Sequence, residues 1–235
     1  HGANIDIDDS LVSKLASFDI ADNLDSLINH GANIDMDSLV PRLKSLSIAD
    51  NLDSLINHGA NIDIDSLVSK LDPSIIANRL DSLINHGANI DIDNLVPRVK
   101  SSEIVYTLDS LINHGANIDN IVSNLDPSDV AKNLDSLTSH GANIDIDSLV
   151  SKLRPSTIVY NLDSLVRHGA SIDNIVSKLH PSNIAYNLDS LISYGANIDI
   201  DRLVSKLDSS DITENLDSLV RHGANIGHMA EIKNK

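Results

Sequence analysis

Apolar residues recur along this chain with the spacing of amphipathic helices. In residues 58–85 a first apolar set occupies positions i, i+3, i+4 and i+7: Ile64, Leu67, Val68 and Leu71. A second set of helical spacing follows: Ile76, Ala77, Leu80, Leu83 and Ile84. Such spacing places apolar side chains on one face of a helix. The pattern therefore predicts a short helix followed by a longer second helix.

Residues with strong positional preferences mark the helix ends. Asp63 supplies an N-cap carboxylate for the first helix, and Asp72 with the proline after it predicts the start of the second. Gly59 is placed to end the preceding helix in a left-handed conformation. Pro41 and Pro97 replace a serine of the first helix, and we expect them in an early turn, with the helix starting later.

A marker of the type "HGAN" divides the chain at nearly constant intervals. It begins at His1, His30, His58, His86, His114, His140, His168, Tyr194 and His222. Since one helix pair cannot bury both of its faces, a fixed period of this size predicts a stack. We expect an all-α solenoid of about eight αα-hairpin repeats over residues 1–221, elongated and superhelical. Residues 222–235 are expected to form a partial repeat, ending in a terminal helix or a vector-derived tail from Ile226.

Composition narrows the class of protein. The 235 residues include no Cys, no Trp, one Phe and 2% aromatic residues, which predicts an aliphatic core without disulfides or thiolate chemistry. A net charge of −17 opposes non-specific binding to nucleic acid or anionic membrane, and no apolar run is long enough to span a bilayer. We expect a soluble cytoplasmic protein. Because the chain begins at His1, inside a repeat, we expect a fragment or processed form.

One column of the second helix differs from repeat to repeat on a face that a helical wheel marks as exposed. Its members are Asp22, Asp50, Asn78, Tyr106, Lys132, Tyr160, Tyr186 and Glu214. No capping rule requires this mixture, and tyrosine is a frequent anchor in interfaces. The column therefore predicts a surface for a protein partner; neutral drift at a solvent position is the alternative. A column one turn earlier, which includes Asp19 and Glu103, is more consistent with helix capping.

A column of cations on the first helix is the basis of a second functional hypothesis. It comprises Lys14, Arg42, Lys70, Arg98, Lys152, Lys178 and Lys206. Cations in a row can follow a phosphate backbone, so nucleic-acid binding is the alternative function. However, the column lies near a helix C-terminus, where Lys and Arg offset the helix dipole. A purely structural role without a natural partner is a third possibility.

The remaining repeated polar residues favour structure over chemistry. Equivalent histidines of stacked repeats are about 8–10 Å apart or more, too far to share one metal ion. The aspartates equivalent to Asp25 and the Asn of "GAN" are expected to form hydrogen-bonded ladders between repeats. Carboxylate pairs such as Asp6 and Asp8 recur in most repeats, whereas an enzyme needs one distinct pocket. We therefore predict no catalytic residue, cofactor or metal.

The segment "LINHGANID" resembles the end of an ankyrin repeat, with its second helix, glycine stop and Ala-Asn-Ile turn. The likeness covers about a third of each repeat; the Thr-Pro-Leu-His helix start of ankyrin repeats is absent. This resemblance implies binding to other proteins. The pattern "P-S-x-I-x-x-N-L-x-x-L-x-x-x-G" is similar to repeats of the mitochondrial transcription terminator family, which implies nucleic-acid binding instead.

Overall fold

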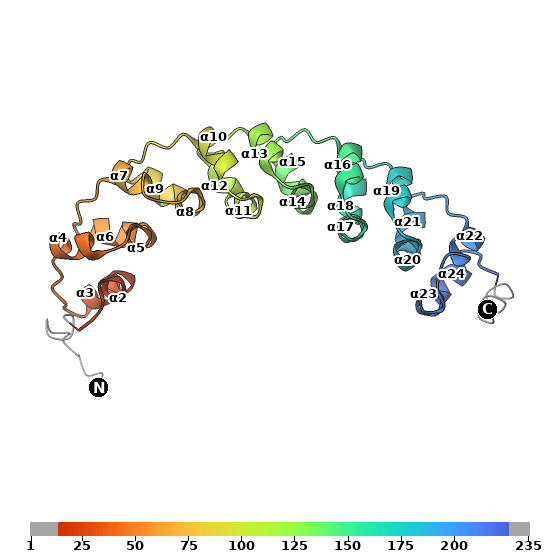
Figure 1. Ribbon diagram of the computed structural model, residues 1–235, viewed down its shortest axis with the longest axis horizontal. Helices are drawn as coiled ribbons and strands as arrows, with labels where there is room; N and C mark the ends of the chain where they lie inside the picture. The colour runs from red at the N-terminus through yellow and green to blue at the C-terminus, as the bar shows by residue number, and fades with distance from the viewer. Residues whose placement is uncertain (1–13, 226–235) are drawn as a thin grey trace. The chain divides into compact units, whose positions relative to one another are not determined.

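The computed structural model describes residues 14–225, in which every regular element is helical and the helices recur in a fixed order (Figure 1). The predicted all-α repeat architecture is confirmed. Within this range, contacts group the chain into two compact units, and the division along the sequence falls between Asn124 and Leu125. We call them the N-terminal unit (14–124) and the C-terminal unit (125–225). The predicted tail from Ile226 and the pair Asp6 and Asp8 lie outside the described residues.

The first helix of each repeat, here helix A, is short. The helices A are α4 (Met36–Leu39), α7 (Ile64–Val68), α10 (Ile92–Leu95), α13 (Ile118–Asn124), α16 (Ile146–Lys152), α19 (Ile172–Lys178) and α22 (Ile200–Val204). The predicted N-cap is present, because the Asp63 carboxylate accepts a hydrogen bond of 3.0 Å from the Ser66 N–H. This contact satisfies a donor that the first turn of a helix leaves free.

Pro41 and Pro97 lie at the end of helix A, so the prediction of a delayed helix start is wrong. Helices α4 and α10 end just before the 3₁₀ turns η1 (Val40–Arg42) and η2 (Val96–Arg98), which contain these prolines. Proline has no N–H to donate to the carbonyl four residues earlier, so the α-helical ladder stops there. The tighter turn completes helix A instead.

The predicted longer second helix is divided into two helices of six residues. The first, helix B1, is α2 (Ser17–Asp22), α5 (Ser45–Asp50), α8 (Pro73–Asn78), α11 (Ser101–Tyr106), α14 (Pro127–Lys132), α17 (Pro155–Tyr160), α20 (Pro181–Tyr186) and α23 (Ser209–Glu214). The second, helix B2, is α3 (Leu24–Asn29), α6 (Leu52–Asn57), α9 (Leu80–Asn85), α12 (Leu108–Asn113), α15 (Leu134–Ser139), α18 (Leu162–Arg167), α21 (Leu188–Ser193) and α24 (Leu216–Arg221).

A single residue between B1 and B2, here the kink residue, interrupts the helix. Asn161, for example, has φ −110° and ψ 19°, outside the α region, and its side-chain Nδ2 donates to the Thr157 carbonyl at 2.8 Å. Asn and Thr side chains compete with helical backbone hydrogen bonds in this way. Six of the eight kink residues are asparagine, and Thr107 makes the equivalent bond to the Glu103 carbonyl at 3.0 Å. The Asn that recurs within the apolar pattern of the second helix was the sequence feature that could have predicted this break.

The core is aliphatic throughout the described chain and runs between successive repeats. One cluster joins Ile20, Leu24 and Leu27 of the first repeat to Met36 and Leu55 of the next. In both units each kind of helix packs against its counterpart, as α17 packs on α20 and α15 on α18. Helices of six residues are marginal in isolation. Burial between repeats is therefore what stabilises them.

Candidate interaction surface

The predicted partner-binding column occupies one structural position, the last residue of helix B1. All eight members are exposed: Asp22, Asp50, Asn78, Tyr106, Lys132, Tyr160, Tyr186 and Glu214. The three tyrosines are strongly exposed, with exposed fractions of 86% for Tyr106, 83% for Tyr160 and 76% for Tyr186. The helical wheel therefore placed this column on the correct face.

The acidic members of the column in the N-terminal unit make contacts that the tyrosines do not share. Asp22 accepts a hydrogen bond of 2.8 Å from Nδ2 of Asn51, the kink residue of the next repeat. Asp50 pairs with Arg79, the next kink residue, at 3.0 Å from Nη2. In these two repeats the column residue contributes to the joint between repeats, so its role is partly structural.

All five aromatic residues of the chain lie on the surface. Besides the three column tyrosines these are Phe18, 55% exposed, and Tyr194, 37% exposed. Aromatic side chains normally contribute large buried areas to a core. In this chain the core contains no aromatic residue, and all five aromatic side chains face solvent.

An apolar surface in the first two repeats was missed by the sequence analysis. Phe18 and Leu46, which is 48% exposed, occupy a position of helix B1 that is serine in the six later repeats. They line a hollow of about 370 Å³ together with Leu43 and with polar and charged residues such as Arg42 and Lys44. The change from Phe and Leu to Ser at this position is visible in the sequence, and a comparison of the repeats could have revealed this surface.

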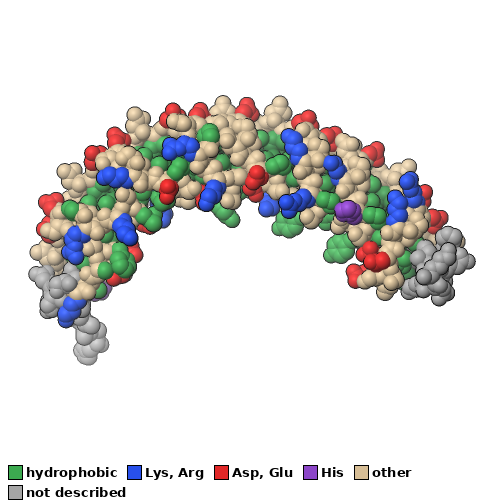
Figure 2. All heavy atoms as spheres, viewed as in Figure 1, with side chains coloured by type: hydrophobic (Ala, Val, Ile, Leu, Met, Phe, Trp, Pro, Cys, Tyr) green, Lys and Arg blue, Asp and Glu red, His purple; other side chains and the backbone are tan. Residues whose placement is uncertain are grey.

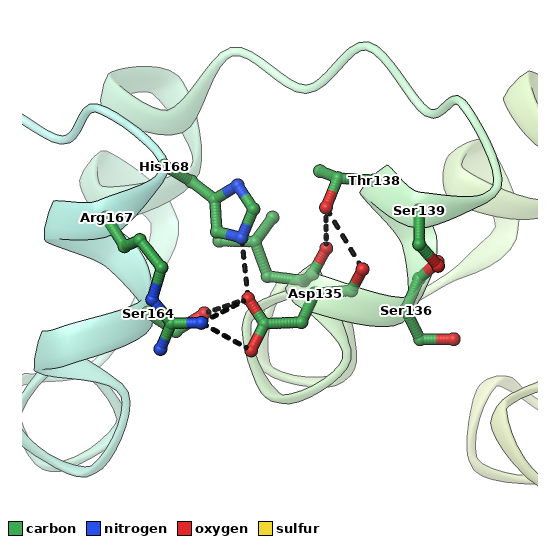
Figure 3. Close-up of polar contacts among 8 residues, drawn as sticks. Asp135, Ser136, Thr138, Ser139, Ser164, Arg167 and His168 are labelled. Carbon is green, nitrogen blue, oxygen red and sulfur yellow. Dashed lines mark hydrogen bonds and ion pairs between the residues drawn. The ribbon is translucent and has the colours of Figure 1, made fainter.

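The aspartate of helix B2 forms the predicted ladder between repeats. In Figure 3, Oδ1 of Asp135 in α15 accepts hydrogen bonds from Ser164 Oγ at 3.3 Å and His168 Nε2 at 2.6 Å, both from the next repeat. Arg167 adds an ion pair to Oδ2 at 3.1 Å. The same Asp–Ser–His contact recurs at Asp25, Asp53, Asp81 and Asp189. We call these groups the Asp ladder.

Hydrogen bonding shifts the titration of the Asp ladder. Bonds from Ser110 and His114 hold the pKa of Asp81 below its ordinary value, because they stabilise the charged carboxylate. In one repeat Tyr194 replaces the histidine and donates to Asp163 at 2.6 Å, which raises the pKa of the Tyr194 phenol. The ladder therefore tolerates a different donor at the histidine position.

The Asp ladder contains the residue types of a hydrolase triad in a different geometry. A histidine that activates serine must bond to its hydroxyl. Here Ser164 and His168 instead both bond to the same oxygen of Asp135. Within residues 14–225 no group of three or more His, Asp or Glu side chains is placed to hold a metal ion. The arrangement joins successive repeats.

Helix A carries a second set of contacts between repeats and the column of cations. Asp147 Oδ1 accepts a hydrogen bond of 2.8 Å from the backbone N–H of Ser171, in the following loop. The "GAN" position therefore contacts the preceding repeat through its backbone N–H, separately from the Asp ladder. Lys178 Nζ donates to the Ser151 carbonyl of the preceding helix A at 2.8 Å. Figure 2 shows acidic side chains along the edge that carries the helices A in Figure 1, with cations beside them.

Comparison with known proteins identifies no relative: no family model, no curated protein and no solved structure matches the chain. None of the helices in the described part of the chain has the length and apolarity that crossing a membrane requires. The exposed residues at the ends of helices B1 are therefore the basis for inferring a function.

Proposed function

We propose that this chain is a non-catalytic, cytoplasmic repeat scaffold that binds a protein partner through the variable, exposed ends of its helices B1. The observation that carries this proposal is the exposure of Tyr106, Tyr160 and Tyr186, at 76–86%, in a chain whose core contains no aromatic residue. Tyrosine supplies a large, rigid and amphipathic contact area at low entropic cost. The repeated contacts of the Asp ladder hold the scaffold without using these positions.

The test compares two triple variants in affinity capture from lysate of the source cells. Tyr106→Ala, Tyr160→Ala and Tyr186→Ala together should abolish capture of the partner, because truncating central aromatic anchors costs about 2 kcal/mol or more each. The same exposure predicts a change in stability within about 0.5 kcal/mol per site, checked by circular dichroism and urea unfolding. Unchanged capture by this variant would refute the proposal.

The matched control replaces exposed cations on the helix A edge, Lys70, Lys152 and Lys206, with alanine. We expect it to capture the partner as the unmodified protein does.

Nucleic-acid binding is the second candidate, because all seven cations of the helix A column are exposed. It is less favoured, because Lys178 is engaged with Ser151, and because acidic residues such as Asp147 and Asp173 lie in the first turns of the same helices. This candidate predicts a mobility shift that weakens steeply with salt and is lost in the cation variant. If no mobility shift is seen at low salt, nucleic-acid binding is excluded as a function.

A further inference from the structure

Four residues of the column end successive B1 helices within the C-terminal unit, and we call them the row. Lys132, Tyr160, Tyr186 and Glu214 end the helices α14, α17, α20 and α23, which follow one another in this order in Figure 1. Helix α20 packs against α17 on one side and α23 on the other. The row therefore presents a cation, two aromatic rings and an anion on successive repeats.

We propose that this row binds a polyproline II segment of a partner protein, with an acidic side chain at one end of the segment and a basic side chain at the other. The inference rests on the proposed function and specifies the chemistry of the partner.

The spacing of the row favours this conformation. Neighbouring packed helices are about 8–10 Å apart. A polyproline II chain rises about 3.1 Å per residue with three residues per turn, so every third side chain returns to the same face after about 9.3 Å. In a β-strand every third side chain points to the opposite face. One turn of polyproline II thus matches the usual distance between packed neighbouring helices, such as α17, α20 and α23.

The chemistry of the row agrees with its spacing. Aromatic side chains on an open surface are the usual contacts of proline rings, and a pre-formed polyproline II chain loses little entropy on binding. Lys132 and Glu214 are exposed; Lys132 lies 3.8 Å from Asp129, and Glu214 accepts a hydrogen bond of 3.2 Å from Ser210. These weak contacts within one helix leave both charges able to attract a charge of the partner.

The first test measures binding of a labelled, end-capped peptide of about ten residues, with glutamate first, lysine last and proline between them, by fluorescence anisotropy. The intact protein should bind with a Kd below about 1 mM. Tyr160→Ala with Tyr186→Ala should weaken binding by about tenfold or more. Phe18→Ala, which removes an exposed aromatic ring of the N-terminal unit that lies outside the column, is the matched control and should leave the Kd unchanged. Equal binding by a helical Ala-rich peptide with the same end charges would overturn the proposal.

The second test uses the charges and gives a gain of affinity, which a folding defect cannot imitate. Glu214→Lys should strengthen binding of the proline peptide with glutamate at both ends by about twofold to fivefold, as expected for exposed ion pairs. It should weaken binding of the peptide with lysine at both ends. No change in either affinity would overturn the proposed placement of the peptide.

The two proposals fail in different ways. If the intact protein does not bind the proline peptides, while the triple tyrosine variant still loses its cellular partner, this inference is wrong and the proposed function stands. If the triple variant retains the partner, the proposed function is wrong, and binding of the proline peptide would then not explain that interaction.

Discussion

At the scale of single residues, one carboxylate oxygen serves two donors from the neighbouring repeat. Asp81 Oδ1 accepts hydrogen bonds from Ser110 Oγ at 2.8 Å and His114 Nε2 at 2.7 Å, although its side chain is 69% exposed. Solvent screens such contacts, so each contributes little by itself. The contact recurs between several pairs of successive repeats, so these small contributions add along the stack.

Replacing Asp81 with alanine should lower the free energy of unfolding at pH 7 by up to about 1 kcal/mol. The pKa of Asp81 is lower in the folded chain than in the unfolded chain. Its contribution is therefore complete above the unfolded value and is lost as pH falls through the folded value. Urea unfolding at pH 7 and at about pH 2.5 should show the difference between the two proteins shrinking in acid.

Asp217→Ala is the control for this prediction. Asp217 holds the same position in α24, is exposed, and makes no Asp–Ser–His contact within residues 14–225. Its replacement should change stability by less than about 0.5 kcal/mol. A difference between intact and Asp81→Ala protein that persists unchanged in acid would contradict the role given to the carboxylate charge.

At the scale of elements, the kink residue separates B1 from B2 and thereby places the variable column. Because B1 ends at residue 160 and Asn161 departs from helical dihedral angles, Tyr160 becomes a helix-terminal residue. Asn161 itself is 8% exposed and bonds to the Thr157 carbonyl at 2.8 Å. The same carbonyl also accepts the Asn161 backbone N–H at 3.1 Å, so the buried amide adds a second donor at the interruption of the helix.

Asn161→Ala should destabilise the chain by about 0.5–1.5 kcal/mol, since the Thr157 carbonyl loses its side-chain donor. Asn161→Thr should recover most of this loss, because Thr107 already makes the equivalent bond in another repeat. Urea unfolding monitored by circular dichroism measures both variants. Equal destabilisation by alanine and threonine would show that the hydrogen bond is not what stabilises the kink.

At the scale of the molecule, stability depends on how well each repeat is covered by its neighbours. Leu188 in α21 is fully buried, whereas Leu216, at the same position in α24, is 41% exposed. Helix α24, the last helix of the described residues, packs on α21 and α23. In an array of this kind, energetic coupling passes mainly between adjacent repeats.

Leu188→Ala should cost about 2–5 kcal/mol, because it opens a cavity between repeats. Leu216→Ala, the matched control, should cost about 1 kcal/mol or less, because part of its apolar surface is already in water. Hydrogen exchange should show the loss of protection in Leu188→Ala concentrated in α20, α21 and α24. Equal loss in α5 and α6 of the N-terminal unit would contradict coupling between neighbours.

The sequence by itself determined the helical repeat, the N-cap at Asp63, the glycine stops and the exposed face that carries Tyr160. These features depend on local periodicity and on dihedral preferences, as at Gly59, whose φ is +92°. The tertiary structure decided the break at Asn161, the late position of Pro41 in helix A, and the division at Asn124. It also supplied the serines of the Asp ladder. The Ser110–Asp81 contact joins residues 29 positions apart, and only the packing of one repeat on the next brings them together.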